Sequence, residues 1–514
     1  MARTAAVVVL LGLGVAAVAV VARSRVRDGE ARPTSAATAE PAAAPTDAPA
    51  SAASVTPPAT GLAPQLRARL PGARWLAIGA GAWPDALQVQ IEQDLEHAQG
   101  SLGAAGVTLL GAGAGAPVVQ VLQAEPERDP VGIALADLFA PRGGRDARYR
   151  APRIAVDAPA RAADVLEALA LATAAPSDAP LLVYVAGHGE RGESPRDNVV
   201  SLWAGSEITV AQLAETLDRA HRPVRLVITT CFSGGFAELA FARAELAAGA
   251  AKAPRCGLFA STWDLEASGC DPNPERSEQQ GYALHFLAAL QRRDREGTPL
   301  AANEVDYDGD GVVGLLEAHT RVRIASRAAD VPTTTAERWL RAHAPKAGPE
   351  QDFALPEEDA VIAALSRRLD LRDEASARRR LAALEADLAA ASHEVEALRD
   401  AELATSRAAA GELLARWPVL DDPWHPDFAT IFRGQRSDIQ RALAGSQPYA
   451  EYVAARARTA AAELALAEQA AEAAPIERLV RAFETRVLAR RLAARGGETF
   501  AAYRRLLSCE RDGW

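Results

Sequence analysis

Residues 181–190 read LLVYVAGHGE, and residues 226–236 read LVITTCFSGGF. Each stretch opens with a run of apolar or β-branched residues and ends at glycines, which is typical of a short strand buried in a sheet. A reactive side chain follows each run, His188 in the first and Cys231 in the second. The two residues are 43 positions apart, enough for one helical crossover, so we expect two neighbouring strands of a parallel sheet.

Apolar runs on either side extend this pattern to an α/β unit over residues 70–345. Strands are predicted at 75–79, 107–111, 181–185, 224–228 and 257–260, and helices at 87–104, 160–174, 210–220 and 282–290. Alternating strands and helices are the pattern of βαβ units, which form a mainly parallel sheet. Residues 112–150 lack the pattern, and we expect an irregular loop there.

His188 and Cys231 have the chemistry of a nucleophile and its acid/base partner. The carboxyl ends of parallel strands meet at one edge of a sheet, where functional side chains gather. A thiol with a pKa of ~8.5 attacks as its thiolate, and an imidazole can stabilise the thiolate or carry its proton. We expect the glycines beside His188 and after Cys231 to leave room for a substrate backbone. The backbone N–H groups of Gly189 and Cys231 can stabilise an oxyanion.

Taken alone, a buried cysteine is usually inert and a histidine in a glycine turn is usually structural. Together, a hydrophobic block ending in His-Gly and a second block ending in Cys and Ser-Gly resemble the clan of cysteine endopeptidases that includes caspases, metacaspases and legumains. The segments FAST (259–262), SGC (268–270) and YALHF (282–286) are similar to bacterial legumain-like or caspase-like members. The resemblance covers about residues 70–345.

This resemblance implies a caspase-like αβα sandwich that cleaves a protein or peptide substrate. It further implies Cys231 as the nucleophile, His188 as the general acid/base and a backbone oxyanion hole near Gly189. Two features depart from the family. Thr229 and Thr230 stand where relatives often have an acidic or small residue, and the caspase signature Gln-Ala-Cys-x-Gly is absent.

The pocket for the residue before the scissile bond is not fixed by these motifs. Asp197, Asp264 and Glu266 are the candidate carboxylates for selecting a basic side chain. The alternative is that these carboxylates are solvated surface groups.

Residues 306–317 read DYDGDGVVGLLE and fit the template of a calcium-binding loop. The expected ligands are the carboxylates of Asp306, Asp308, Asp310 and Glu317 and the backbone carbonyl of Val312. We expect a structural Ca²⁺ rather than a catalytic metal, and a metal-free Asp/Gly-rich turn is the alternative.

The composition excludes other classes of function. The net charge of −11 gives no general attraction to phosphate backbones, so we expect no nucleic-acid partner. Four cysteines in 514 residues are too few for a disulfide scaffold. Cys256 and Cys270 either form a disulfide or remain free, and Cys509 has no assigned role.

Residues 1–27 contain an uncharged apolar run from Ala5 to Ala22, which is just long enough to span a bilayer. We expect an uncleaved membrane anchor, and a cleaved signal peptide is the alternative. Residues 28–68 are rich in Ala and Pro and predict a disordered linker. A tether of this kind favours a catalytic domain on the extracytoplasmic, periplasmic side.

Residues 356–514 predict an all-α region. Leucines at 381, 384 and 388 begin a short coiled-coil-like seam, and Pro418 through Pro426 interrupt it. A second helical stretch, from 449 to 507, completes a helical hairpin or small bundle. Its role is either packing alone or the binding of a partner protein.

Three hypotheses follow for the whole chain. The first is a membrane-tethered cysteine endopeptidase that forms a thioester acyl-enzyme. The second is an inactive peptidase fold that serves as a calcium-dependent adaptor and binds partners through its helical tail. The third keeps the Cys-His pair but transfers the acyl group to an amine.

Overall fold

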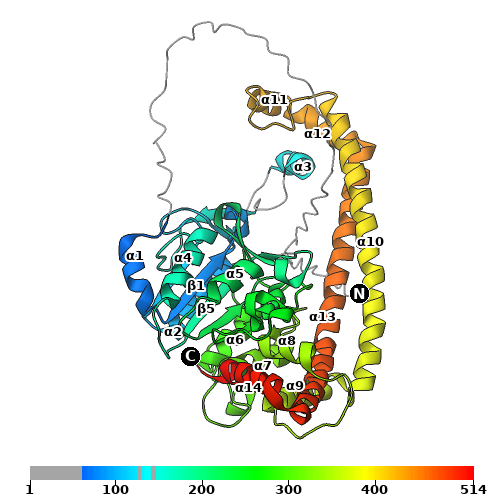
Figure 1. Cartoon of the computed structure of the whole chain (residues 1–514). Helices are drawn as coiled ribbons and strands as arrows, with labels where there is room; N and C mark the ends of the chain where they lie inside the picture. The colour runs from blue at the N-terminus through cyan, green and yellow to red at the C-terminus, as the bar shows by residue number, and fades with distance from the viewer. Residues whose placement is uncertain (1–60, 124–128, 141–145, 514) are drawn as a thin grey trace, which may run out of the picture. The chain divides into compact units, whose positions relative to one another are not determined.

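A six-stranded, mainly parallel sheet forms the centre of the computed structural model, which describes residues 61–123, 129–140 and 146–513 (Figure 1). The strand order is β11-β10-β9-β5-β1-β2, and β11 is the antiparallel member. The strands are β1 (Trp75–Ala80), β2 (Gly106–Leu110), β5 (Leu181–Gly187), β9 (Val224–Ile228), β10 (Arg255–Phe259) and β11 (Thr333–Thr334). The predicted α/β class with a mainly parallel sheet is therefore confirmed.

Helices cover both faces of the sheet. Along β5, Leu182 and Tyr184 join one hydrophobic core, whereas Leu181 and Val183 join the other. One core packs against α2 (Val89–Leu102), α6 (Tyr282–Gln291), α7 (Leu315–Ala325) and α8 (Thr335–His343); the other packs against α1 (Pro64–Arg69), α4 (Ala162–Thr173) and α5 (Val210–Leu217). Because both faces are buried, side chains on both sides of the central strands are buried, and in β5 every side chain is apolar or aromatic rather than every second one.

The segment 112–150, which was expected to be irregular, contains three regular elements: β3 (Val119–Leu122), α3 (Pro130–Phe139) and β4 (Ala147–Arg150). Helix α3 starts where the Asp129 carboxylate accepts a hydrogen bond from the N–H of Val131, with proline at the first helical position. The expectation was wrong because the apolar side of α3 is buried by residues far away in the sequence, including Trp417 and Ile439.

The predicted long C-terminal helical region is also confirmed. Its helices are α9 (Pro356–Leu369), α10 (Glu374–Leu414), α11 (Phe428–Gly434), α12 (Arg436–Gly445), α13 (Gln447–Arg495) and α14 (Gly497–Arg511). Helices α10 and α13 form an antiparallel hairpin, which Figure 1 shows as the two longest helices side by side. The second helix ends earlier than expected, because Gly496 has a φ of +65° that stops α13 before α14 begins.

The predicted membrane or signal segment at residues 1–27 lies outside the described residues, as does most of the predicted linker at 28–68. The end of that linker is ordered: Leu62 and Leu66 are buried in the core beside α4. Within the described ranges, no helix combines the length and the apolarity that a bilayer span requires. Residues Leu62–Trp514 form one compact unit.

A disulfide joins Cys256 on β10 to Cys509 on α14. Both alternatives stated for Cys256, a bond to Cys270 and a free thiol, are therefore wrong. Cys270 lies in the loop after β10 and is free. The bond spans 253 residues and holds the last helix against the sheet. Close by, the Arg225 guanidinium forms an ion pair with Asp512 at 2.7 Å.

We predict that Cys509→Ser lowers the free energy of unfolding by about 2–5 kcal/mol, because the bond restricts a long loop of the unfolded chain. Urea denaturation of the oxidised protein measures the change. Cys270→Ser is the control and should leave the midpoint nearly unchanged. Equal midpoints for Cys509→Ser and wild type would contradict the prediction.

Candidate active site

The parallel pairing of β5 and β9 sets His188 and Cys231 at the same edge of the sheet. Val185 is the register partner of Ile228, and each candidate residue lies three positions beyond its member of that pair. The segments that follow β5 and β9 also touch. A Cβ added to Gly189 would lie 2.5 Å from the Cys231 carbonyl oxygen. The structure therefore brings the two motifs together.

The Cys231 thiol is half-buried and is bracketed by one peptide. Its Sγ donates a hydrogen bond to the Ala267 carbonyl at 3.4 Å and accepts one from the Ala267 N–H at 3.3 Å. Burial raises the pKa of Cys231 to about 11, and the nearby carboxylates of Glu266 and Asp330 act in the same direction. In this arrangement the thiol is protonated at neutral pH.

The His188 imidazole is also half-buried, and its partner is not Cys231. Its Nε2 forms a hydrogen bond with Oε1 of Gln88 at 2.8 Å. Burial lowers the pKa of His188, with Asp85 opposing the change, so the ring is neutral near pH 7 and can accept a proton. A catalytic pair would form a direct hydrogen bond between imidazole and thiol. Here the imidazole contacts Gln88 instead, and the thiol contacts Ala267.

The glycines around the two residues serve the chain's own packing. A Cβ on Gly187, whose φ is +132°, would lie 1.9 Å from the Ala80 carbonyl oxygen. A Cβ on Gly234 would lie 2.5 Å from the Ser261 carbonyl oxygen. These positions require glycine because strands and turns approach closely there. Close packing within the chain therefore accounts for glycine at these positions.

The two proposed oxyanion donors lie close together. Gly189 begins β6 (Gly189–Glu190), which pairs with β7 (Val199–Leu202). The Cys231 N–H lies against its own sulfur, where it opposes the rise in the thiol pKa. Phe232, the next residue, has a φ of +57°, so the chain turns sharply directly after Cys231. The turn presents the thiol at the end of β9.

The three candidate specificity carboxylates do not converge on one point. Asp197 is exposed and accepts a hydrogen bond from the Ser194 hydroxyl at 2.6 Å. Asp264 is exposed and accepts one from Thr262 at 2.9 Å. Glu266 is the member of the set whose charge reaches Cys231, and partial burial raises its own pKa.

Two buried residues that the motifs did not predict hold this site together. Asn198 donates from Nδ2 to the carbonyls of Phe232 (2.8 Å) and Trp263 (2.7 Å). Asp330 is fully buried, accepts a hydrogen bond from the Ser268 N–H at 2.6 Å, and leaves its Oδ2 without a partner. Burial raises the pKa of Asp330 to about 6. Neither residue belongs to a recognisable motif, so the sequence alone gave no signal for them.

A small cavity of about 10 Å³ lies beside the two strand ends. Its lining includes Gly187, Thr229, Asp94 and Cys270. Asp94 is buried, and one of its oxygens accepts a hydrogen bond from Arg276 at 2.7 Å. The cavity is too small for a peptide side chain in this conformation.

The predicted calcium loop brings three of its four candidate carboxylates together. The carboxylates of Asp306, Asp308 and Glu317 lie within 4.8 Å of one another. Asp310 lies outside this group, and its carboxylate accepts a hydrogen bond from the Val312 N–H at 2.7 Å. The Glu317 carboxylate accepts hydrogen bonds from three backbone N–H groups, one of them at the start of α7. Oxygen donors of this kind fit a hard cation such as Ca²⁺.

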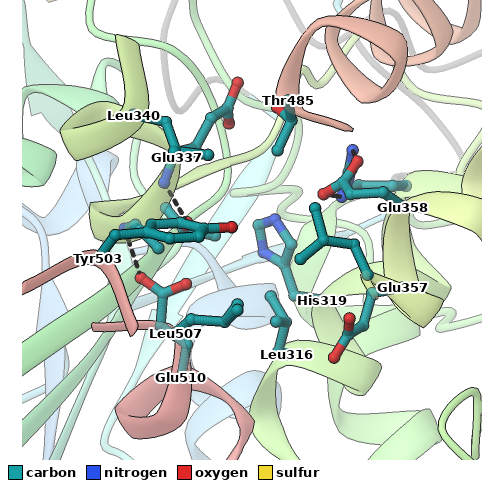
Figure 2. A pocket seen from close by; sticks show the side chains of 14 residues that line it. Leu316, His319, Glu337, Leu340, Glu357, Glu358, Thr485, Tyr503, Leu507 and Glu510 are labelled. Carbon is teal, nitrogen blue, oxygen red and sulfur yellow. Dashed lines mark hydrogen bonds and ion pairs between the residues drawn. The ribbon is translucent and has the colours of Figure 1, made fainter. Parts of the chain in front are cut away.

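A second cavity, of about 20 Å³, lies under α14 and away from the strand ends (Figure 2). Figure 2 shows His319, Tyr503 and Glu510 around it, together with the carboxylates of Glu337, Glu357 and Glu358. Glu510 is fully buried; its Oε1 accepts hydrogen bonds from Thr335 (2.6 Å) and Ala336 (2.7 Å), and its Oε2 has no partner. Burial raises the pKa of Glu510 to about 8.

Comparison with known proteins adds no family assignment: no protein-family model matches the chain, and no curated protein has a significantly similar sequence.

The raised pKa of Glu510 predicts how stability depends on pH. The pKa of Glu510 is about 8 in the folded protein and 4.5 in the unfolded chain. The protonated carboxyl therefore stabilises the fold fully below pH 4.5, and this stabilisation is lost as the pH rises towards 8. We expect Glu510→Gln to flatten the unfolding free energy between pH 5 and 8, a difference of a few kcal/mol. Urea unfolding at several pH values measures it.

Glu498→Gln is the matched control for this experiment, since Glu498 is exposed on the same helix. Its pH profile should follow wild type. A Glu510→Gln profile parallel to wild type would show that Glu510 does not titrate in this range.

Proposed function

We propose that the protein is a cysteine endopeptidase with a caspase-like αβα sandwich fold, in which Cys231 is the nucleophile and His188 the general acid/base. One observation carries the proposal: the ends of β5 and β9 present an imidazole and a thiol in equivalent positions, with their backbones in contact at Gly189. Acyl transfer needs these two groups at one open edge. The order of the motifs along the chain supports the same conclusion.

The reaction divides into two steps. The Cys231 sulfur attacks the scissile carbonyl and forms a carbon–sulfur bond, while the thiol proton passes through His188 to the departing amine as the carbon–nitrogen bond breaks. Water then attacks the thioester, with His188 removing its proton, and the acid product leaves as the thiol is restored. The N–H groups of Gly189 and Cys231 are assigned to the oxyanion.

The side chains that surround the pair must rearrange for this chemistry. His188 has to exchange its hydrogen bond with Gln88 for one with the thiol, and Cys231 has to leave the Ala267 peptide. Both changes are rotations of single side chains or movements of one loop. The neutral imidazole favoured by burial is the form that accepts the thiol proton.

If an amine replaces water in the second step, the product is a new amide, and the mass of the product distinguishes the two reactions.

We assign a structural Ca²⁺ to the loop at 306–317, bound through Asp306, Asp308 and Glu317, with no role in the bond-breaking step. The loop supports the C-terminal end of the chain: a Cβ on Gly314 would lie 2.0 Å from the Arg511 carbonyl oxygen. A cation there would stabilise the packing of α14 against the α/β region.

We also assign the catalytic region to the extracytoplasmic side, held by a membrane anchor in residues 1–27. The Cys256–Cys509 disulfide supports this assignment, because such bonds persist in oxidising compartments.

The second candidate function is a calcium-dependent adaptor without catalysis, in which the α10–α13 hairpin binds a partner protein. The protonated, covered thiol is the observation that favours this alternative.

The endopeptidase proposal predicts that Cys231→Ala and His188→Ala each lower the cleavage of a peptide library by roughly 10³-fold or more. Mass spectrometry of the products measures cleavage and residue preference together. His221→Ala is the matched control, because His221 is exposed at the opposite edge of the sheet, before β9. Equal cleavage by wild type and Cys231→Ala would refute the proposal, and no cleavage by either would favour the adaptor.

The calcium assignment predicts that Ca²⁺ raises the melting temperature of wild type relative to EDTA, and that Asp308→Asn weakens this effect. Binding at 100 times the dissociation constant contributes about 2.7 kcal/mol. Thermal melts with 10 mM Ca²⁺, about 100 times a dissociation constant of ~10⁻⁴ M, provide the measurement. Asp400→Asn, an exposed residue on α10, is the control. A wild type that is indifferent to Ca²⁺ would leave the loop as a metal-free turn.

A further inference from the structure

We propose that residues 263–271, here called the cover segment, act as an autoinhibitory cover that keeps the Cys231 thiol unreactive until the segment moves. This inference rests on the proposed function, since it concerns the regulation of the same site. It is carried by the contacts of the segment with Cys231 and by the way its two ends are anchored.

The centre of the cover segment occupies both hydrogen-bonding directions of the thiol. The Ala267 carbonyl accepts from Sγ and the Ala267 N–H donates to it, at 3.4 and 3.3 Å. A scissile peptide must approach the same sulfur to be attacked. The cover segment therefore holds a peptide of the chain itself where a substrate peptide has to lie, and the two cannot be present together.

Hydrogen bonds from different parts of the fold hold both ends of the cover segment. The carbonyls of Trp263 and Leu265 accept from the Asn198 side chain (2.7 Å) and the Phe232 N–H (2.9 Å). At the other end, the Ser268 N–H donates to Asp330 (2.6 Å) and the Asp271 N–H donates to Gln90 (2.9 Å). Three of these partners, Asn198, Asp330 and Gln90, are fully buried.

The cover segment itself is built to open without unfolding the core. Asp264, Leu265, Glu266 and Gly269 are exposed, and Ala267 and Cys270 are the members of the segment that pack, partly buried, against a hydrophobic core. Cys270 has a φ of +62°, a left-handed conformation that costs a side-chain-bearing residue roughly 1–2 kcal/mol. Segments held by a few polar contacts and little apolar burial open at low free-energy cost.

Asp330 is the strongest of the anchors. It presents a buried carboxylate to the Ser268 N–H, and hydrogen bonds to charged groups are roughly twice as strong as neutral ones. Its pKa is about 6, so at pH 7.5 it is mainly ionised. The other charged group near the thiol is Glu266, on the cover segment itself. Removing the acceptor at position 330 should therefore release the segment next to Ala267.

The test measures thiol reactivity and needs no catalysis. Wild type, Asp330→Ala and Asp330→Asn are treated with iodoacetamide at pH 7.5, and the alkylation rate of the Cys231 peptide is followed by mass spectrometry. We expect Asp330→Ala to react at least tenfold faster, and on the order of 100-fold faster if the thiol pKa falls from about 11 to its ordinary value near 9. Asp330→Asn keeps an acceptor for the Ser268 N–H but removes the charge that disfavours the thiolate, so it should react faster than wild type and clearly slower than Asp330→Ala.

Equal alkylation rates for wild type and Asp330→Ala would overturn the proposal. An increase in Asp330→Asn as large as that in Asp330→Ala would also overturn it, because it would assign the effect to charge alone. If Asp330→Ala does not fold, as judged by circular dichroism, Ser268→Pro removes the same hydrogen bond from the exposed side. Ser268→Ala keeps the N–H and is its control. Faster alkylation without any cleavage of peptides would support the cover and refute the endopeptidase, so the two proposals fail separately.

Discussion

The parallel pairing of β5 with β9 is the constraint on which the rest of the site depends. Both strands are buried on both faces, so their register is fixed by two cores at once. A shift of one residue would turn every side chain of a strand to the opposite face. The register that pairs Val185 with Ile228 therefore also fixes how far His188 lies from Cys231. The close approach at Gly189 follows from the same pairing.

The parts that the sequence predicts well are those in which local pattern and final environment agree. The largely apolar runs at 181–185 and 224–228 are central strands because helices bury both of their faces, and the run at 224–228 is interrupted only by Arg225. Helix α3 shows the opposite case. Its Asp-Pro start is a local signal, but its apolar side is buried only by Trp417 and Ile439, which lie in the C-terminal region. No reading of residues 112–150 alone contains that partner.

The contacts that decide the state of the site are non-local, and for this reason the motifs could not reveal them. Gln88 reaches His188 across 100 positions, and Asp330 reaches Ser268 across 62. Cys509 pairs with Cys256 over 253 positions, whereas the spacing of Cys256 and Cys270 suggested a nearer partner. Motifs identify which groups can react. The side chains that control their reactivity reach them only through tertiary contacts. Their residue types are common elsewhere in the chain, so no motif marks them.

One buried carboxylate affects both the reactivity of the Cys231 thiol and the position of the cover segment. Asp330 accepts the hydrogen bond that holds the cover segment, and its negative charge also disfavours the thiolate of Cys231. Burial is the main cause of the raised thiol pKa, and Asp330 adds to it while it also holds the cover segment in place. A site regulated in this way needs no separate inhibitory domain: moving the loop removes the peptide from the sulfur, admits water and lets the imidazole approach. The strand pairing remains unchanged throughout, and only the polar contacts above it are exchanged.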